Sequence, residues 1–153
     1  TEKGADGDLP VLTTGYETGE EILAARIDAV FAEGFGPARA TNAEVFGSLD
    51  NYYIVNYWVE AEYLDPGHIP GAVQYTPKAS ISLDADLKTL PAGEDVVVYC
   101  YTGQTSANMA AYLRVIGYDA KTLLFGTNGM IYDDMTKSKW SDGAIMGYDY
   151  VTE

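Results

Sequence analysis

The spacing of apolar residues predicts an amphipathic helix near the start of the chain. Thr18 is a candidate N-cap for this helix, and Gly34 ends the run. Between them, five apolar residues recur at helical spacing: Ile22, Leu23, Ile27, Val30 and Phe31. A second, short helix is predicted from Thr41 or Asn42 through Phe46. The residues before Thr18 show no period and are expected to be irregular.

Nearly continuous apolar runs predict strands that are covered on both faces, as in a parallel sheet. The predicted strands are residues 52–55, 72–75, 95–99 and 121–125. Predicted helical segments alternate with them: a turn that begins at Ser82, residues 105–116 ending at Gly117, and residues 130–135. This alternation predicts an α/β domain with a mainly parallel central sheet flanked by helices on both faces. In the polar tail that follows, Trp140, Ile145 and Met146 are the predicted anchors.

The length of 153 residues is typical of one domain with a single core. We expect residues 1–40 to form an irregular segment plus one amphipathic helix packed on the domain, and residues 41–153 to form the domain with an irregular C-terminal tail. The net charge of −14 argues against nucleic acid and anionic membrane surfaces as partners. The longest central apolar run, Val96 to Tyr101, is far shorter than a membrane span, so no membrane insertion is expected.

Cysteine and histidine usage limits the kinds of site that the chain can build. Cys100 is the only cysteine, which excludes an intrachain disulfide and a cysteine-cluster metal site. His68 is the only histidine, which argues against a His-rich zinc site, and it is interpreted as a structural hydrogen-bonding residue. These counts therefore predict that the chain holds no metal. The chain begins at Thr1, either by trimming or by removal of a targeting peptide, and the second case predicts export to the periplasm or cell surface.

Cys100 is the main candidate for chemistry because it ends the predicted strand 95–99 and precedes a polar loop and a helix. Ligands of α/β sheets bind at the carboxyl ends of strands, and a helix N-terminus stabilises a thiolate. The alternative is a small buried core cysteine without a chemical role. In the first interpretation, the loop surrounds the sulfur with N–H groups and hydroxyls, and Gly103 permits the tight curvature. The candidate substrate-binding residues are Tyr101, Thr102, Gly103, Gln104, Thr105 and Ser106.

Two segments of the chain resemble the rhodanese-like domain family, specifically its small single-domain thiosulfate sulfurtransferases. Residues 67–72 read Gly-His-Ile-Pro-Gly-Ala, which is similar to a signature of that family, and Glu62-Tyr63 matches the acidic–aromatic pair before it. Residues 96–106 resemble the active-site strand and loop, in the form Cys-Tyr-x-Gly-x-(Ser/Thr)-Ser. The segment from Ala120 to Gly129 is similar to the late strand and its glycine turn. The resemblance spans roughly residues 41–135 in the expected order.

The resemblance implies a sulfurtransferase that needs no cofactor. Cys100 would accept the outer sulfur of a small anionic donor such as thiosulfate and hold it as a persulfide, within the backbone of residues 101–105. It would then pass the sulfur to a thiophilic acceptor, which in a cell would be a thiol. Covalent catalysis in two displacement steps predicts ping-pong kinetics.

The sequence departs from the family pattern at two places. Asn56-Tyr57-Trp58 replaces the frequent Asp-x-Arg at the end of the first strand, which removes an ion pair. The cysteine loop ends at Ser106 without an arginine, which argues against phosphatase or arsenate reductase activity. A dianionic donor that approaches a protein of charge −14 without a cationic clamp is expected to bind weakly. Lys78 and Arg114 are the candidate nearby cations.

Two alternatives to a sulfurtransferase remain open from the sequence. The first is a non-catalytic rhodanese-like module that binds a partner protein through a surface formed by Trp58 and the tail. The second is a module that senses sulfur species or redox state through its thiol. A reactive, accessible thiol favours the nucleophile, and a buried, inert thiol favours the binding module.

Overall fold

A five-stranded sheet in the order β1-β5-β4-β2-β3 forms the centre of the molecule, and all four strand pairings are parallel. The computed structural model describes residues 2–149 and 151–152. The strands are β1 (Arg39–Ala40), β2 (Tyr52–Asn56), β3 (Val73–Gln74), β4 (Asp95–Tyr99) and β5 (Ala120–Leu123). The mixed α/β class and the parallel sheet expected from the sequence are confirmed.

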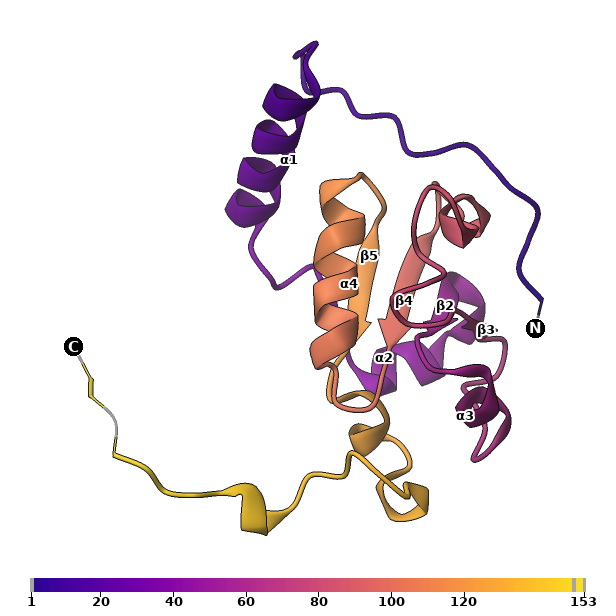
Figure 1. Cartoon of the computed structure of the whole chain (residues 1–153), viewed down its shortest axis with the longest axis vertical. Helices are drawn as coiled ribbons and strands as arrows, with labels where there is room; N and C mark the ends of the chain where they lie inside the picture. Colours follow the sequence, from indigo (N-terminus) through magenta and orange to yellow (C-terminus); the bar gives the residue numbers. More distant parts are fainter. Residues whose placement is uncertain (1, 150, 153) are drawn as a thin grey trace.

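Four α-helices and five short 3₁₀ turns lie before, between and after these strands in the described part of the chain. The α-helices are α1 (Gly19–Glu33), α2 (Asn42–Gly47), α3 (Glu60–Leu64) and α4 (Gln104–Val115). The 3₁₀ turns are η1 (Leu49–Asn51), η2 (Asp86–Thr89), η3 (Gly126–Gly129), η4 (Tyr132–Asp134) and η5 (Asp142–Ala144). Figure 1 shows α1 beside α4, and the C-terminal tail extending away from the sheet. Within the described residues, no helix is both long enough and apolar enough to span a membrane.

The central strand β4 is buried on both faces, which explains its continuous apolar sequence. Val96 and Val98 belong to a cluster with Ala110 and Leu113 of α4. Val97 and Tyr99 belong to the opposite cluster, which also contains residues of α2 and α3. Because side chains alternate along a strand, β4 contributes residues to the apolar clusters on both faces of the sheet. Cys100 follows directly at the carboxyl end of this central strand.

The predicted helix boundaries are largely confirmed by their capping contacts. The side chain of Thr18 accepts a hydrogen bond from the backbone of Glu21, and the N–H of Gly34 closes α1. Thr41, one of the two predicted caps of α2, forms a reciprocal capping box with Glu44. Side-chain and backbone hydrogen bonds from Thr41 lower the pKa of Glu44 from its usual value.

Several sequence predictions are wrong in detail. Residues 130–135 do not form an α-helix; in that segment the chain makes only the 3₁₀ turn η4, which follows η3 at Gly126–Gly129. The two-residue strand β1 was not predicted, and it pairs with β5 at the edge of the sheet. Of the predicted anchors of the tail, Ile145 and Met146 are 77% and 63% exposed, whereas Trp140 packs on Phe125 and donates its backbone N–H to Asn128.

The N-terminal helix α1 lies against α4 without burying any of its own residues. Leu23 and Phe31 on its apolar stripe are 51% and 69% exposed. The contact between the two helices therefore combines partly buried apolar side chains with a polar network, which is described below.

Candidate active site

Cys100 lies at the carboxyl end of β4 and is only 4% exposed. The chain reverses from this strand into α4 through residues 101–103. Gly103 adopts a left-handed conformation (φ 88°) as the N-cap of α4. A Cβ at Gly103 would lie 3.2 Å from the backbone nitrogen of Phe125 and 3.3 Å from the carbonyl oxygen of Leu123. Glycine is therefore required here both by conformation and by the close approach of β5.

The first turn of α4 holds the sulfur. The backbone N–H of Ser106, the third residue of the helix, donates to Cys100 Sγ at 3.4 Å, and the thiol donates to Ser106 Oγ at 3.5 Å. N–H groups in a first helical turn have no partner within the helix, and the helix dipole adds positive potential there. The sulfur therefore lies where a negative charge is stabilised, as the sequence predicted for a loop that joins a strand to a helix.

A second hydroxyl, from Thr122 of β5, lies within hydrogen-bonding distance of the Ser106 hydroxyl. Ser106 Oγ lies 2.7 Å from Thr122 Oγ1, and both hydroxyls lie near the carbonyl oxygen of Gly103, at 3.1 and 3.3 Å. If the thiol loses its proton, the Ser106 hydroxyl can turn its own hydrogen to the sulfur while Thr122 donates to Ser106. Sequence reasoning missed Thr122, whose only signal is a hydroxyl within a short strand that is otherwise partly apolar.

We expect Ser106→Ala to slow the alkylation of Cys100 by iodoacetamide at neutral pH. The variant removes the one hydroxyl that contacts the sulfur, and a hydrogen bond to a charged group contributes enough for an effect of about ten-fold or more. The measurement is the rate of carbamidomethylation by mass spectrometry, with the exposed Ser82→Ala as the matched control. An unchanged rate in Ser106→Ala would show that the hydroxyl does not stabilise the thiolate.

The turn η3 fixes the direction of the loop's peptide groups. The N–H of Thr127 donates to the carbonyl oxygen of Cys100 at 3.0 Å, and the N–H of Asn128 donates to that of Tyr101 at 3.0 Å. In a trans peptide the following N–H points the opposite way, so the N–H groups of Tyr101 and Thr102 point away from η3. In the described part of the chain these N–H groups have no hydrogen-bond acceptor, so they remain available to an anion.

Asn128 links this loop to the segment that leads into the tail. Its side-chain Nδ2 donates to the carbonyl oxygens of Tyr101 at 2.8 Å and Ser138 at 2.9 Å. Its Oδ1 accepts from the backbone N–H of Trp140 at 2.9 Å. One buried amide therefore joins the cysteine loop to the start of the tail, and sequence reasoning did not single it out.

The other predicted loop residues lie in different environments. Tyr101 is half-buried, and its ring stacks on that of Trp58 with centroids 4.7 Å apart. Thr102 Oγ1 accepts from the N–H of Gln104 at 3.4 Å, which tightens the loop. Gln104 and Thr105 are exposed, and within the described chain neither side chain contacts Cys100 by a hydrogen bond. The structure thus brings only Ser106, of the predicted side chains, into contact with the sulfur.

The Gly67–Ala72 segment contacts the end of β4 and has a structural role. The hydroxyl of Tyr99 accepts from the N–H of Ile69 at 3.2 Å and from Asn56 Nδ2 at 2.8 Å. Burial raises the pKa of Tyr99 to about 12, so this hydroxyl stays protonated at neutral pH. His68 Nδ1 lies 2.8 Å from the carbonyl oxygen of Tyr63, and the two rings stack. These contacts agree with the structural interpretation of His68.

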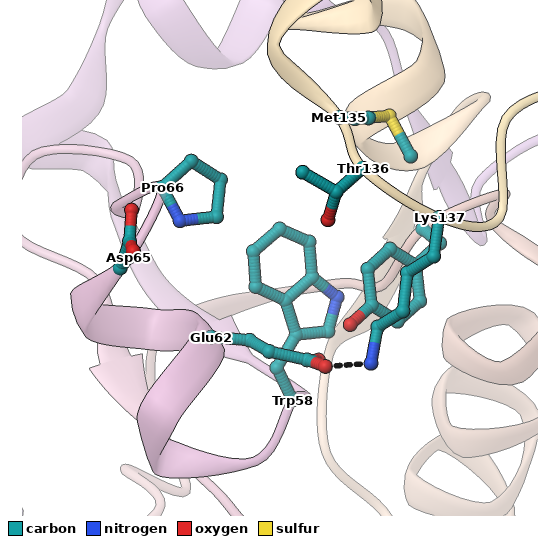
Figure 2. A pocket seen from close by; sticks show the side chains of 8 residues that line it. Trp58, Glu62, Asp65, Pro66, Met135, Thr136 and Lys137 are labelled. Carbon is teal, nitrogen blue, oxygen red and sulfur yellow. Dashed lines mark ion pairs between the residues drawn. The ribbon is translucent and has the colours of Figure 1, made fainter.

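A cavity of about 140 Å³ adjoins the cysteine loop at Tyr101. Figure 2 shows Asp65 and Pro66 on one side of it, Thr136 and Lys137 on the other, and Trp58 between them. The expectation that Trp58 contributes to an exposed partner-binding surface is wrong, because its side chain is 2% exposed beneath Tyr101. Lys137 pairs with Glu62 and lies over the ring of Tyr101, 5.6 Å from its centroid.

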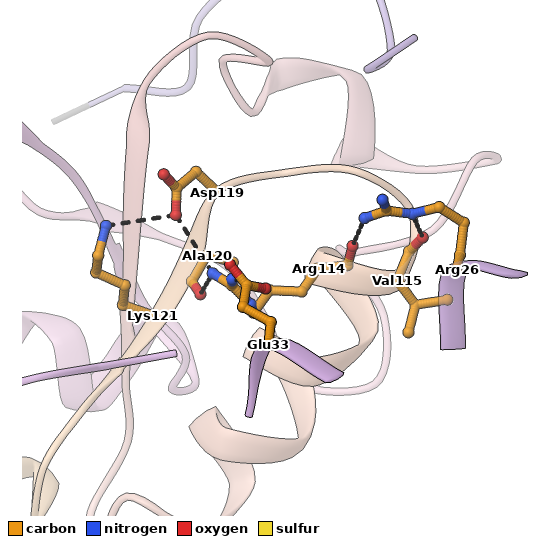
Figure 3. A network of polar contacts seen from close by, with 7 residues as sticks. All are labelled: Arg26, Glu33, Arg114, Val115, Asp119, Ala120 and Lys121. Atoms are coloured by element: carbon orange, nitrogen blue, oxygen red, sulfur yellow. Dashed lines mark hydrogen bonds and ion pairs between the residues drawn. The ribbon is translucent and has the colours of Figure 1, made fainter. Parts of the chain in front are cut away.

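Lys137 is the cation that the sequence did not identify. Of the two cations it did name, Lys78 is exposed and does not line this cavity. Arg114 is buried near the C-terminal end of α4, where it pairs with Glu33 of α1 and with Asp119 (Figure 3). Lys137 lies beside the cysteine loop at Tyr101, whereas the guanidinium of Arg114 takes part in these two ion pairs, one of which joins α1 to α4. No group of three or more potential metal ligands occurs among the described residues.

The same polar network attaches α1 to the domain. Arg26 Nε donates to the carbonyl oxygen of Val115 at 3.0 Å, and its Nη2 donates to that of Arg114 at 2.6 Å (Figure 3). Both carbonyls belong to the last turn of α4; that of Arg114 also accepts the N–H of Gly117, while that of Val115 accepts no backbone N–H in the described part of the chain. Arg26 therefore acts as a side-chain cap supplied by another helix.

We expect Arg26→Met to loosen α1 and to speed chymotrypsin cleavage after Phe35, in the segment between α1 and β1. Loss of the two charged hydrogen bonds should raise the cleavage rate about five-fold, because opening of that segment becomes easier by about 1 kcal/mol. Arg39→Met is the matched control, since Arg39 is exposed and its side chain makes no hydrogen bond with the described residues. Equal rates in the two variants would contradict this role.

The chain is similar in sequence to one known protein family and in structure to several solved proteins. The sequence profile of a family described as the rhodanese-like domain matches residues 49–132. A rhodanese-related protein from Thermoplasma volcanium has a similar structure, with a TM-score of 0.55 and 18% identity, over 62% of this chain and 91% of that one. A protein from Staphylococcus saprophyticus matches with a TM-score of 0.50 and 24% identity, over 58% of this chain and 88% of that one. None of the curated protein sequences compared with this chain matches it.

Proposed function

The chain belongs to the rhodanese-like domain family, and from this premise we propose that it is a sulfurtransferase that carries sulfane sulfur on Cys100. The observation that supports this function best is the position of the sulfur: Cys100 Sγ accepts the N–H of Ser106 in the first turn of α4. Such a position stabilises a thiolate, and it equally stabilises the terminal anion of a persulfide.

In the first step, the Cys100 thiolate attacks the outer sulfur of a donor such as thiosulfate. A sulfur–sulfur bond forms to Cys100, the bond between the two donor sulfurs breaks, and sulfite leaves with the electron pair. In the second step, an acceptor thiolate attacks the outer sulfur of the persulfide. The electron pair returns to Cys100, and the acceptor leaves as a persulfide. Charge and electrons balance in both steps, so the proposed chemistry requires no cofactor.

The loop 101–106 is proposed to bind the sulfur that is being transferred. Because η3 binds the carbonyls of Cys100 and Tyr101, the N–H groups of Tyr101 and Thr102 point to the opposite side. Ser106 adds a hydroxyl, and Gly103 allows the reversal of the chain. Gln104 and Thr105 complete the loop through their backbone.

The test of this function is the mass of the wild-type protein before and after incubation with thiosulfate. The expected result is a gain of one sulfur atom, removed again by cyanide or by a thiol. An unmodified protein after treatment with thiosulfate, an organic thiosulfonate and a polysulfide would overturn the proposal.

The second candidate function is a module that binds a partner protein beside the cysteine loop. Phe125 precedes η3, is 56% exposed and packs edge-on against Trp140, with ring centroids 5.5 Å apart. Two half-exposed aromatic rings next to the loop are suited to a protein contact. A protein of this kind would acquire no sulfur from donors and would retain partner binding in Cys100→Ser.

We also propose the two-part organisation of the chain that the sequence predicts, with one adjustment. Residues 2–38 contribute an irregular segment and α1. Because β1 pairs with β5, the rhodanese-like domain is best taken to begin at Arg39.

A further inference from the structure

Two buried polar atoms in the cavity beside Tyr101 have no hydrogen-bond partner among the described residues. They are Trp58 Nε1 and Tyr101 Oη. Trp58 is 2% exposed and lines the cavity, and Figure 2 shows its indole nitrogen on the side of Thr136 and Lys137. An indole N–H can only donate, and a buried donor without an acceptor is destabilising. The cavity therefore presents donors that an acceptor group of a ligand would satisfy.

Opposite walls of this cavity carry opposite charges. Lys137 lies on one side together with the hydroxyl of Thr136, and Asp65 lies on the other side (Figure 2). Glu62 pairs with Lys137, which leaves two of the three ammonium hydrogens for other acceptors. Pro66 and Met135 add apolar surface between the charged groups. A ligand that matches this arrangement carries a carboxylate at one end, an ammonium group at the other and a short aliphatic part.

The size of the cavity limits the ligand to a small molecule. Its volume is about 140 Å³, and a cavity of about 150 Å³ holds a molecule the size of benzene. A zwitterion has no net charge, so the protein's charge of −14 does not repel it, unlike an anionic substrate.

We propose that this cavity binds a small zwitterionic amino-acid thiol, with free cysteine as the simplest example, as the acceptor of the sulfur. Its carboxylate is bound by Lys137 and by the indole N–H of Trp58, and its ammonium group by Asp65. Assignment as an acceptor rests on the sulfurtransferase function proposed above. The thiolate of the bound amino acid attacks the outer sulfur of the Cys100 persulfide, and the electron pair of the broken bond returns to Cys100.

The test is a binding measurement that does not depend on sulfur transfer. In Cys100→Ser the protein contains no thiol, so added thiols cannot form mixed disulfides with it. The protein has two tryptophans, and their two indole N–H signals can be followed by ¹H–¹⁵N NMR. The signal of Trp58 reports the cavity, and that of the half-exposed Trp140 serves as an internal reference. The four probes are L-cysteine, 3-mercaptopropionate, cysteamine and 2-mercaptoethanol.

We expect a saturable shift of the Trp58 signal with L-cysteine, and binding about ten-fold or more weaker for the probes that lack one charged group. Lys137→Gln should remove most of the advantage of a carboxylate, so that the difference in affinity between L-cysteine and cysteamine becomes much smaller than in the parent protein. Asp65→Asn should remove the advantage of an ammonium group, so that L-cysteine and 3-mercaptopropionate bind alike. Lys139→Gln is the matched control, because Lys139 lies over the ring of Tyr132, away from this cavity.

The result that overturns the inference is an unmoved Trp58 signal with L-cysteine, or equal affinity for all four probes. This outcome is distinguishable from failure of the proposed function. If the wild-type protein gains sulfur but L-cysteine does not bind, the acceptor site is wrong and sulfur transfer stands. If L-cysteine binds but no donor adds sulfur to Cys100, the site stands as a binding site and the transfer reaction is wrong.

Discussion

Cys100→Ser is expected to gain no sulfur under conditions in which the wild-type protein gains one atom from thiosulfate. Cys100 is the only cysteine, so the variant has no thiolate that could attack the donor. A serine hydroxyl is a far weaker nucleophile at neutral pH and cannot form a stable sulfur adduct. The measurement is intact-protein mass spectrometry of both proteins after identical treatment, and the expected effect is complete loss of the adduct.

The control for this prediction is the fold of the variant. Serine has nearly the same shape as cysteine, and its hydroxyl can accept the N–H of Ser106 that the sulfur accepts in the wild type. Circular dichroism and the urea midpoint of Cys100→Ser should therefore stay close to those of the wild type. An adduct of the same mass on Cys100→Ser would mean that sulfur binds elsewhere, and it would contradict the assignment of Cys100.

Gly126→Ala is expected to destabilise the protein by about 3 kcal/mol or more, the largest effect on stability expected of any variant discussed. Gly126 has a φ of 52°, and a Cβ there would lie 2.2 Å from the carbonyl oxygen of Cys100. It would also lie 2.9 Å from the carbonyl carbon and oxygen of Tyr101. These are backbone atoms, so they can move away only if the cysteine loop itself shifts.

Gly71→Ala separates the cost of conformation from the cost of the clash. Gly71 also has a positive φ, of 82°, but a Cβ there would meet no atom within 4 Å. Its substitution should lower the free energy of unfolding by only about 1 kcal/mol, from backbone strain. Urea denaturation of both variants measures the difference. Equal losses would show that η3 has room for a side chain and does not fix the loop closely.

Elements with a strong apolar pattern were predicted well from the sequence. The apolar run Val96–Val98 predicts β4 with its observed bounds. A strand that is buried on both faces has few polar residues, so its apolar pattern is continuous and easy to recognise. The helix between Thr18 and Gly34 was also predicted correctly at both ends, since its caps are local signals. The position of Cys100 at the carboxyl end of a central strand follows directly from the bounds of β4.

Features that depend on contacts distant in sequence were not predicted. Thr122 contacts Ser106 across 16 positions, and nothing in the local pattern of β5 indicates that contact. Lys137 reaches the cavity because Asn128 holds the backbone of residues 138 and 140, and this too is a long-range arrangement. The prediction for residues 130–135 was wrong because the apolar spacing of six residues fits a short α-helix and a single 3₁₀ turn equally well.

The side-chain amide of Asn128 also positions two walls of the cavity relative to each other: the cysteine loop at Tyr101 and the segment that contains Lys137. It forms hydrogen bonds with Tyr101 in the cysteine loop and with Ser138 and Trp140, which follow Lys137 in the sequence. The cysteine loop and the segment after Lys137 therefore share one anchoring amide. A substitution that removes this amide would loosen the cysteine loop and the segment after Lys137 together.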